Sequence, residues 1–354
     1  MSESGDYQQS SYWSGHDFGD AYARYDQHAG RSYAQAQSAG VTIQDLVPKR
    51  ISTQSTRPLL IRIDHTGSMH EAPKKIFEKL PYLSHEARQY LGDDTELSVG
   101  AIGDMSNGQV AGEGDRYPLQ IRDFAQLSVP QAGAKTKRKT AQWEDPEIAK
   151  RLLELVIEGG GGGQMHENYE FAMLYDARNV DMPRAITPVA IYIGDEMPYE
   201  VLAPEYAEHY GHLALERSMT IQEVVAELQQ KYSVYFIQLP YSGHVDGDQM
   251  TADTKTVHRT WANLLGEDQV KYLPDPARVV DLIFGILAQE TGRDAYFRQE
   301  IEARQTPAQV RTVYKALGTT HKLPSGKEPR GLRSGKSTLH RPSSGKKTKG
   351  LLDD

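Results

Sequence analysis

Short apolar runs alternate with amphipathic helical patterns through the middle of the chain. The runs are typical of buried strands and occupy residues 59–63, 96–102, 117–124, 189–193, 233–239 and 270–273. Between them, apolar residues recur every three or four positions, which predicts helices over residues 71–91, 146–158, 166–180, 220–231, 252–265 and 275–289. This alternation predicts an α/β fold with a doubly wound, mostly parallel central sheet flanked by helices. Such folds bind ligands at the carboxyl ends of their strands.

The two ends of the chain differ in composition from the middle. The first part is rich in Tyr, Gln and Ser, and the last part is a basic segment in which Ser-Gly-Lys occurs three times. Neither end has enough aliphatic residues for a core of its own, so we expect both to be disordered. The expected organisation is an arm with a lead-in that packs on the body (1–50), a domain (51–292), a helical extension (293–317) and a basic tail (318–354).

Composition excludes several classes of protein. The 354 residues include no cysteine, which excludes disulfides, zinc–thiolate sites and cysteine nucleophiles. The N-terminus lacks the features of a signal peptide, and the apolar run at residues 279–288 is too short to span a bilayer. We therefore expect a cytoplasmic protein without a membrane partner.

Charge is unevenly distributed. The tail has nine Lys and Arg residues against three acids, a charge of +6, and since the net charge is −8 the remainder carries −14. An acidic body with a basic tail favours a tail that contacts the body, a partner or a polyanion. A tail that simply stays solvated is the alternative.

One loop carries a concentration of oxygen ligands. The first predicted strand ends in Asp64-His65-Thr66-Gly67-Ser68-Met69. A carboxylate followed by hydroxyls at the second and fourth positions offers three hard oxygens to a cation such as Mg²⁺, which also keeps several waters. The alternative is that Ser68 only caps the following helix.

Two other loops are expected at the same edge of the sheet. Asp195 follows the strand at residues 189–193, and the glycine run at residues 159–163 leads into Gln164-Met165-His166-Glu167. Agreement among three loops favours a metal site over a chance motif. Asp195 as an ordinary turn residue is the alternative. Asp104, at the end of the strand at 96–102, is expected to support the site from behind the ligands.

These residues resemble the von Willebrand factor A (VWA) domain over roughly residues 57–291. The D-x-T-G-S motif at Asp64, Thr66 and Ser68 is similar to the family's metal-ion-dependent adhesion site (MIDAS), and Asp195 matches its third-loop aspartate. The resemblance implies bound Mg²⁺ or Mn²⁺ and a bacterial or phage-encoded, intracellular protein.

The second loop departs from the family pattern. It offers Gln164, His166 and Glu167 where related proteins commonly supply a threonine. Glu167 is the residue that we expect near the metal, directly or through water. A histidine ligand would shift the preference toward manganese or nickel.

The resemblance implies a metal-dependent protein-interaction module rather than an enzyme. The open metal vertex would take a carboxylate from a partner protein. Intracellular bacterial members of the family are often associated with AAA-type ATPases or multiprotein assemblies. One alternative is a metal-assisted hydrolase with Glu167 or His166 as the base. Another is nucleic-acid association through the tail, which without aromatic residues should be weak, salt-sensitive and independent of sequence.

Two further patterns are interpreted as non-functional. His209 and His212 have a metal-like spacing, but a solvated face is the preferred interpretation. Residues 331–337 look like a phosphate-binding loop, but they have one residue too few between the glycines and no strand before them.

Overall fold

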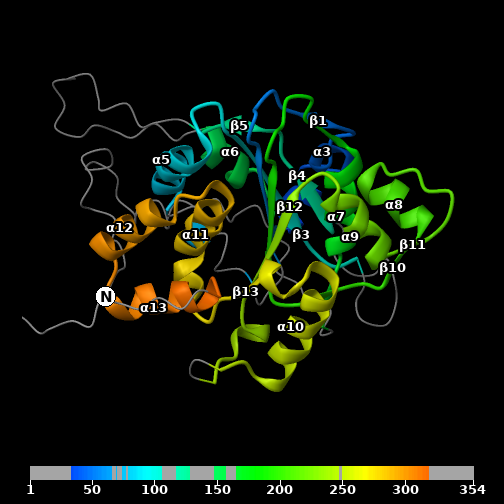
Figure 1. Cartoon of the computed structure of the whole chain (residues 1–354). Helices are drawn as coiled ribbons and strands as arrows, with labels where there is room; N and C mark the ends of the chain where they lie inside the picture. The colour runs from blue at the N-terminus through cyan, green and yellow to red at the C-terminus, as the bar shows by residue number, and fades with distance from the viewer. Residues whose placement is uncertain are drawn as a thin grey trace, which may run out of the picture. The chain divides into compact units, whose positions relative to one another are not determined.

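The computed structural model describes most of the central part of the chain (Figure 1). The described residues are 33–65, 69, 74–76, 79–105, 117–127, 147–156, 165–246 and 249–318. The chain divides into two units, residues 1–320 and 321–354, and every described element belongs to the first. Thr66, Ser68 and Gln164 lie outside the described residues.

A seven-stranded sheet forms the centre of the first unit. Its strands are β2 (Leu59–Asp64), β3 (Glu96–Ile102), β4 (Leu119–Ile121), β5 (Ala125–Gln126), β8 (Val189–Gly194), β12 (Ser233–Gln238) and β13 (Val270–Tyr272). The order is β13-β12-β8-β2-β3-β4, with β5 also paired to β3. All pairs are parallel except those that β4 and β5 make with β3. The predicted fold class, a doubly wound and mostly parallel sheet, is confirmed.

The central strands are buried along their whole length. Every residue of β2 and β8 is buried, which explains why the two strands are mostly apolar in sequence. Arg62 is a charged residue in the middle of β2, and its guanidinium lies 2.6 Å from the Asp176 carboxylate inside the protein. A charged residue is therefore accommodated in a central strand by a buried partner.

Helices cover both faces of the sheet (Figure 1). Side chains alternate along β2, so that Ile61 and Ile63 belong to one core cluster and Leu60 to the other. The first cluster is completed by α5 (Leu80–Leu91), α6 (Glu147–Leu153), α11 (Val279–Thr291), α12 (Asp294–Arg304) and α13 (Pro307–Ala316). The second is completed by α3 (Ile43–Leu46), α7 (Tyr169–Arg178), α8 (Pro204–Gly211), α9 (Ile221–Gln229) and α10 (Ala252–Leu265).

Short elements surround this framework. Three two-stranded pairs are β1 (Ile51–Ser52) with β7 (Val180–Asp181), β6 (His166–Glu167) with β9 (Met197–Pro198), and β10 (Val201–Leu202) with β11 (Met219–Thr220). The remaining elements are α2 (Tyr33–Ser38) and the 3₁₀ turns η3 (Tyr241–Gly243), η4 (Glu267–Gln269) and η5 (Pro276–Arg278). Among the described residues, no helix combines the length and the apolar character needed to cross a membrane.

Two local predictions are wrong. The expected strand at 117–124 is divided into β4 and β5, which both pair antiparallel with β3. Between Ile121 and Ala125 this segment has one residue more than the facing stretch of β3 from Leu97 to Gly100, so the pairing is interrupted. The expected helix at 166–180 begins only at Tyr169, because His166 and Glu167 pair as β6 with a distant segment of the chain. In the predicted arm, Ala36 of α2 is buried, as are Ile43 and Leu46 of α3.

Candidate functional site

The strand order of the sheet reverses between β2 and β8, so that successive strands are added on opposite sides of this pair. In chain order, the strands of the main path lie in the sequence 3-2-1-4-5-6, and β2 and β8 are the first and fourth. Open α/β sheets bind ligands at this switch point, outside the carboxyl ends of the strands. Asp64 is the last residue of β2, and Asp195 follows β8 directly. Since Ile63 is in register with Ile193, Asp64 faces Gly194, and Asp195 is one residue farther along at the same edge of the sheet.

Both aspartates are held by hydrogen bonds from other segments. Each is 0% exposed. The Tyr169 hydroxyl, from the first turn of α7, donates to Asp64 Oδ2 at 3.0 Å. The backbone N–H of Ser242 donates to Asp195 Oδ2 at 2.8 Å. Ser242 has a φ of 50°, a left-handed conformation that a non-glycine residue adopts at a cost, and it serves here to direct an amide at a buried carboxylate.

Further carboxylates crowd the same edge. Glu196, Glu167 and Asp104 are all buried. Burial, reinforced by the negative charges of Asp64 and Asp195, raises the pKa of Glu196 to about 9, and a hydrogen bond with Glu167 opposes the rise. At neutral pH and without a cation, Glu196 therefore carries a proton.

The electrostatic environment of Tyr169 reflects the same concentration of charge. Burial, followed by the carboxylates of Asp64 and Asp195, raises its pKa well above the usual 10. The hydroxyl therefore keeps its proton and remains a hydrogen-bond donor throughout the physiological pH range.

The two titratable residues of the second loop, His166 and Glu167, lie in different surroundings. Because β6 is a strand, the side chains of His166 and Glu167 point to opposite sides. Glu167 is buried and bonded to Glu196, whereas the half-buried His166 ring stacks on Tyr199 at 5.4 Å between centroids. Burial lowers the pKa of His166, so its imidazole is neutral at pH 7.

A network behind the loops joins them to one another. Asn168 donates its backbone N–H to Gly103 O at 3.1 Å and accepts from the backbone N–H of Met105 at 2.7 Å. The Tyr199 hydroxyl donates to Asp104 Oδ1 at 2.9 Å. The loops after β3, β6 and β9 are thus tied together behind the two aspartates.

A fully buried acid lies in this network. Glu170 accepts hydrogen bonds from the Asn168 side-chain amide at 2.7 Å and from the backbone N–H of Tyr199 at 3.3 Å. Burial raises the pKa of Glu170 to about 8. Sequence reasoning missed Tyr169, Glu170 and Tyr199, whose positions give no local signal. Glu196, directly after Asp195, could have been found from its place in the chain.

The structure brings together Asp64, Asp195 and Glu167 of the predicted ligands. It places His166 on the other side of β6 from Glu167. Carboxylate oxygens suit Mg²⁺ or Mn²⁺, and a cation would offset both the burial and the neighbouring negative charges that raise the pKa of Glu196, so the donor chemistry fits the expected metal. Within the described part of the chain, no three His, Asp or Glu residues are grouped so that they could hold a metal by themselves.

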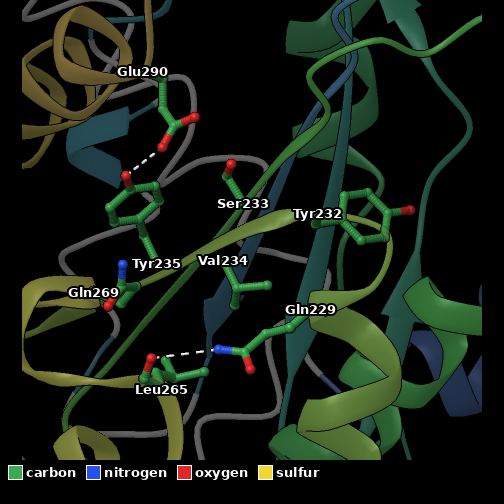
Figure 2. Close-up of a pocket in the computed structure, with 8 residues that line it drawn as sticks. All are labelled: Gln229, Tyr232, Ser233, Val234, Tyr235, Leu265, Gln269 and Glu290. Carbon is green, nitrogen blue, oxygen red and sulfur yellow. Dashed lines mark hydrogen bonds between the residues drawn. The ribbon is translucent and has the colours of Figure 1, made fainter.

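A separate cavity lies at the amino end of β12 (Figure 2). Its volume is about 290 Å³. Tyr235 donates its hydroxyl to Glu290, and Gln229 donates to Leu265 O at 3.3 Å. Because Ser233 begins β12, the cavity lies toward the end of the sheet opposite to Asp64 and Asp195. Its lining residues are Gln229, Tyr232, Ser233, Val234, Tyr235, Leu265, Gln269 and Glu290.

Comparison with known proteins shows only remote similarity. No protein-family model and no curated protein matches the chain. Similar solved structures include the pilus adhesin SpaC from Lactobacillus rhamnosus GG, with 10% identity and a TM-score of 0.39 over 73% of this chain and 32% of that one. A von Willebrand factor type A structure from Catenulispora acidiphila has 15% identity and a TM-score of 0.35, and the match covers 67% of this chain and 43% of that one. Proximal thread matrix protein 1 from the mussel byssus has 12% identity and a TM-score of 0.37, and the match covers 67% of this chain and 48% of that one.

This chain spans less than half the length of each of these three proteins. At such identities and scores, the fold assignment rests on the strand order itself. The chain is a doubly wound α/β protein.

Proposed function

We propose that this chain is a VWA-type module that binds a protein partner through a divalent cation at the carboxyl edge of β2 and β8. The observation that carries the proposal is the pair Asp64 and Asp195, fully buried at the switch point of the sheet. Two buried carboxylates from adjacent strands repel one another, and a divalent cation bound by both would offset that repulsion.

The remaining ligands come from the first loop. The D-x-T-G-S motif supplies the hydroxyls of Thr66 and Ser68 next to Asp64. Mg²⁺ or Mn²⁺ bound by these oxygens would retain exchangeable water. A partner's Asp or Glu can replace that water, and the contact is strong because it forms where water is excluded. A bacterial or phage assembly that includes an AAA-type ATPase is the partner class that the family resemblance favours.

Calorimetric titration of Mg²⁺ and Mn²⁺ into the chelator-treated full chain tests the proposal. We expect saturable binding to the wild type and its loss in Asp64→Asn and Asp195→Asn, which keep the size of the side chain but remove its charge. Asp181→Asn, at an exposed aspartate of β7, is the matched control and should bind as the wild type does. A wild type that binds neither metal, or unaltered binding by both site variants, contradicts the proposal.

A second measurement tests the mode of action. Capture of a partner by the immobilised full chain should require Mg²⁺, disappear with chelator and disappear in Asp64→Asn. Turnover of a phosphate ester or a peptide by the metal-loaded protein would instead indicate a metal-assisted hydrolase.

A further inference from the structure

Tyr169 is the side chain of α7 that contacts the candidate site directly. It is 0% exposed, and its hydroxyl lies 3.0 Å from Asp64 Oδ2. The two residues are 105 positions apart in the chain. A neutral hydroxyl that donates to a buried carboxylate fixes the direction of that carboxylate.

Gly194 makes this contact possible. A Cβ atom at position 194 would lie 1.7 Å from the Tyr169 hydroxyl oxygen and 2.8 Å from the ring carbon that bears it. Any other amino acid at position 194 would place its Cβ atom where the Tyr169 hydroxyl lies. The Gly194-Asp195 pair therefore has two roles, since the glycine admits Tyr169 and the aspartate contributes a carboxylate.

The ring of Tyr169 is held on its other sides by aromatic residues. It makes edge contacts with Phe236 at 5.6 Å and with Trp261 at 5.1 Å, and these two rings stack on each other at 4.0 Å. The Trp261 indole N–H donates to Glu196 O at 2.8 Å. Residues of α7, β12 and α10 thus form one packed block beneath the acidic edge, and the tyrosine has no room to swing away.

We infer that Tyr169 is the positioning residue of the cation site, which orients Asp64 before the cation arrives. The inference rests on the proposed function. Partners of this kind, which orient a ligand without touching the metal, typically contribute 10- to 100-fold to metal affinity. Tyr169 fits this description because its hydroxyl is bonded to the ligand residue and its ring is locked by packing.

A matched pair of variants separates positioning from simple stability. Tyr192→Phe is the control, because Tyr192 is also fully buried and donates its hydroxyl to a buried carboxylate, that of Asp176, at 2.9 Å. Both Tyr169→Phe and Tyr192→Phe keep the ring and lose one hydrogen bond, so we expect similar losses of Tm, about 4 °C each. Only Tyr169→Phe should weaken Mg²⁺ binding in calorimetry, by about tenfold.

The outcomes distinguish this inference from the proposed function. If the wild type and Tyr169→Phe bind Mg²⁺ equally well, the positioning role is overturned and the proposed function stands. Equal weakening by Tyr192→Phe also overturns it, because the effect is then one of stability. A wild type that does not bind Mg²⁺ overturns both.

Tryptophan fluorescence provides a second readout. The chain has three tryptophans, so replacing Trp13 and Trp143 by Phe leaves Trp261 as the reporter. Trp261 contacts the Tyr169 ring and donates a hydrogen bond to the backbone oxygen of Glu196. We therefore expect the emission of Trp261 to change as Mg²⁺ is added. In the Tyr169→Phe background, the midpoint of that change should move to about tenfold higher Mg²⁺. An unmoved midpoint contradicts the inference.

Discussion

Arg62 of β2 and Asp176 of α7 form an ion pair in which both side chains are 0% exposed, with 2.6 Å between Nη2 and Oδ1. The Arg62 Nε also lies 3.0 Å from the second carboxylate oxygen, so the contact is bidentate. Tyr192 donates to the same carboxylate. This pair ties the central strand of the site to the helix that carries Tyr169.

Removal of one partner from this pair should strongly destabilise the protein. We expect Asp176→Ala to lower the free energy of unfolding by about 3–5 kcal/mol, because it leaves the guanidinium buried without its counter-charge. Urea denaturation of the full chain measures the loss. Replacing both partners, as in Arg62→Met with Asp176→Leu, should recover much of it.

The exposed pair Arg217 and Glu223 provides the contrast. The two groups approach to 2.5 Å, but the side chains are 69% and 39% exposed. Arg217→Gln should leave the free energy of unfolding almost unchanged, since solvent screens the pair. A loss as large as that of Asp176→Ala would show that burial is not what makes the first pair important.

Gly194→Ala should disturb both stability and cation binding. The new methyl group would collide with the Tyr169 hydroxyl, and the enclosed ring could move only with its neighbours. We expect a loss of about 1–3 kcal/mol in the free energy of unfolding, as for other overpacked cores, together with weaker Mg²⁺ binding. Chemical denaturation and calorimetry measure the two effects.

Gly285→Ala is the matched control for that substitution. A Cβ at position 285 of α11 would also meet a side chain closely, at 2.5 Å from Leu317 Cδ1. That atom is the end of a flexible side chain, and alanine favours the helix, so the two effects partly cancel. We expect a smaller loss of stability and unchanged Mg²⁺ affinity.

Stability of the metal-free protein should fall as the pH rises from about 4.5 to about 8. Burial raises the pKa of Glu170 to about 8, above its ordinary value of 4.5. Between these values the folded state binds the proton more tightly than the unfolded state, so raising the pH favours unfolding. The slope contributed by this residue is at most about 1.4 kcal/mol per pH unit.

Glu170→Gln tests the origin of that slope. Glutamine resembles the protonated acid and does not titrate, so urea denaturation over the same pH range should give a shallower decline. Glu205→Gln, at an exposed position in α8, should keep the decline of the wild type. If both variants decline equally, Glu170 is not the titrating group.

The two second-loop candidates should respond differently to substitution. Glu167 is buried against Glu196, whereas His166 stacks on Tyr199. We expect Glu167→Gln to weaken Mg²⁺ binding by about tenfold and His166→Phe, which preserves the stacking, to leave it unchanged. Calorimetry of both variants decides between them, and the reverse result would assign the histidine to the site.

The sequence by itself determined the central strands of the sheet and two residues of the site, Asp64 and Asp195. The strands ending in Asp64 and Gly194-Asp195 are mostly apolar runs, because parallel strands covered on both faces bury nearly all of their side chains. Their parallel arrangement follows from the alternation with helices, and it brings both aspartates to one edge. These features depend on local pattern and a general rule of topology.

Only the tertiary structure decided how that edge is built. His166 and Glu167 fit a helical pattern as well as a strand, and it was pairing with β9 that made them β6 and turned Glu167 inward. The hydrogen bond from Tyr169 to Asp64 depends on the space that Gly194 leaves on a third element. Such contacts join residues far apart in the chain, and their energies are set by packing and burial, which neighbouring residues in a sequence do not encode.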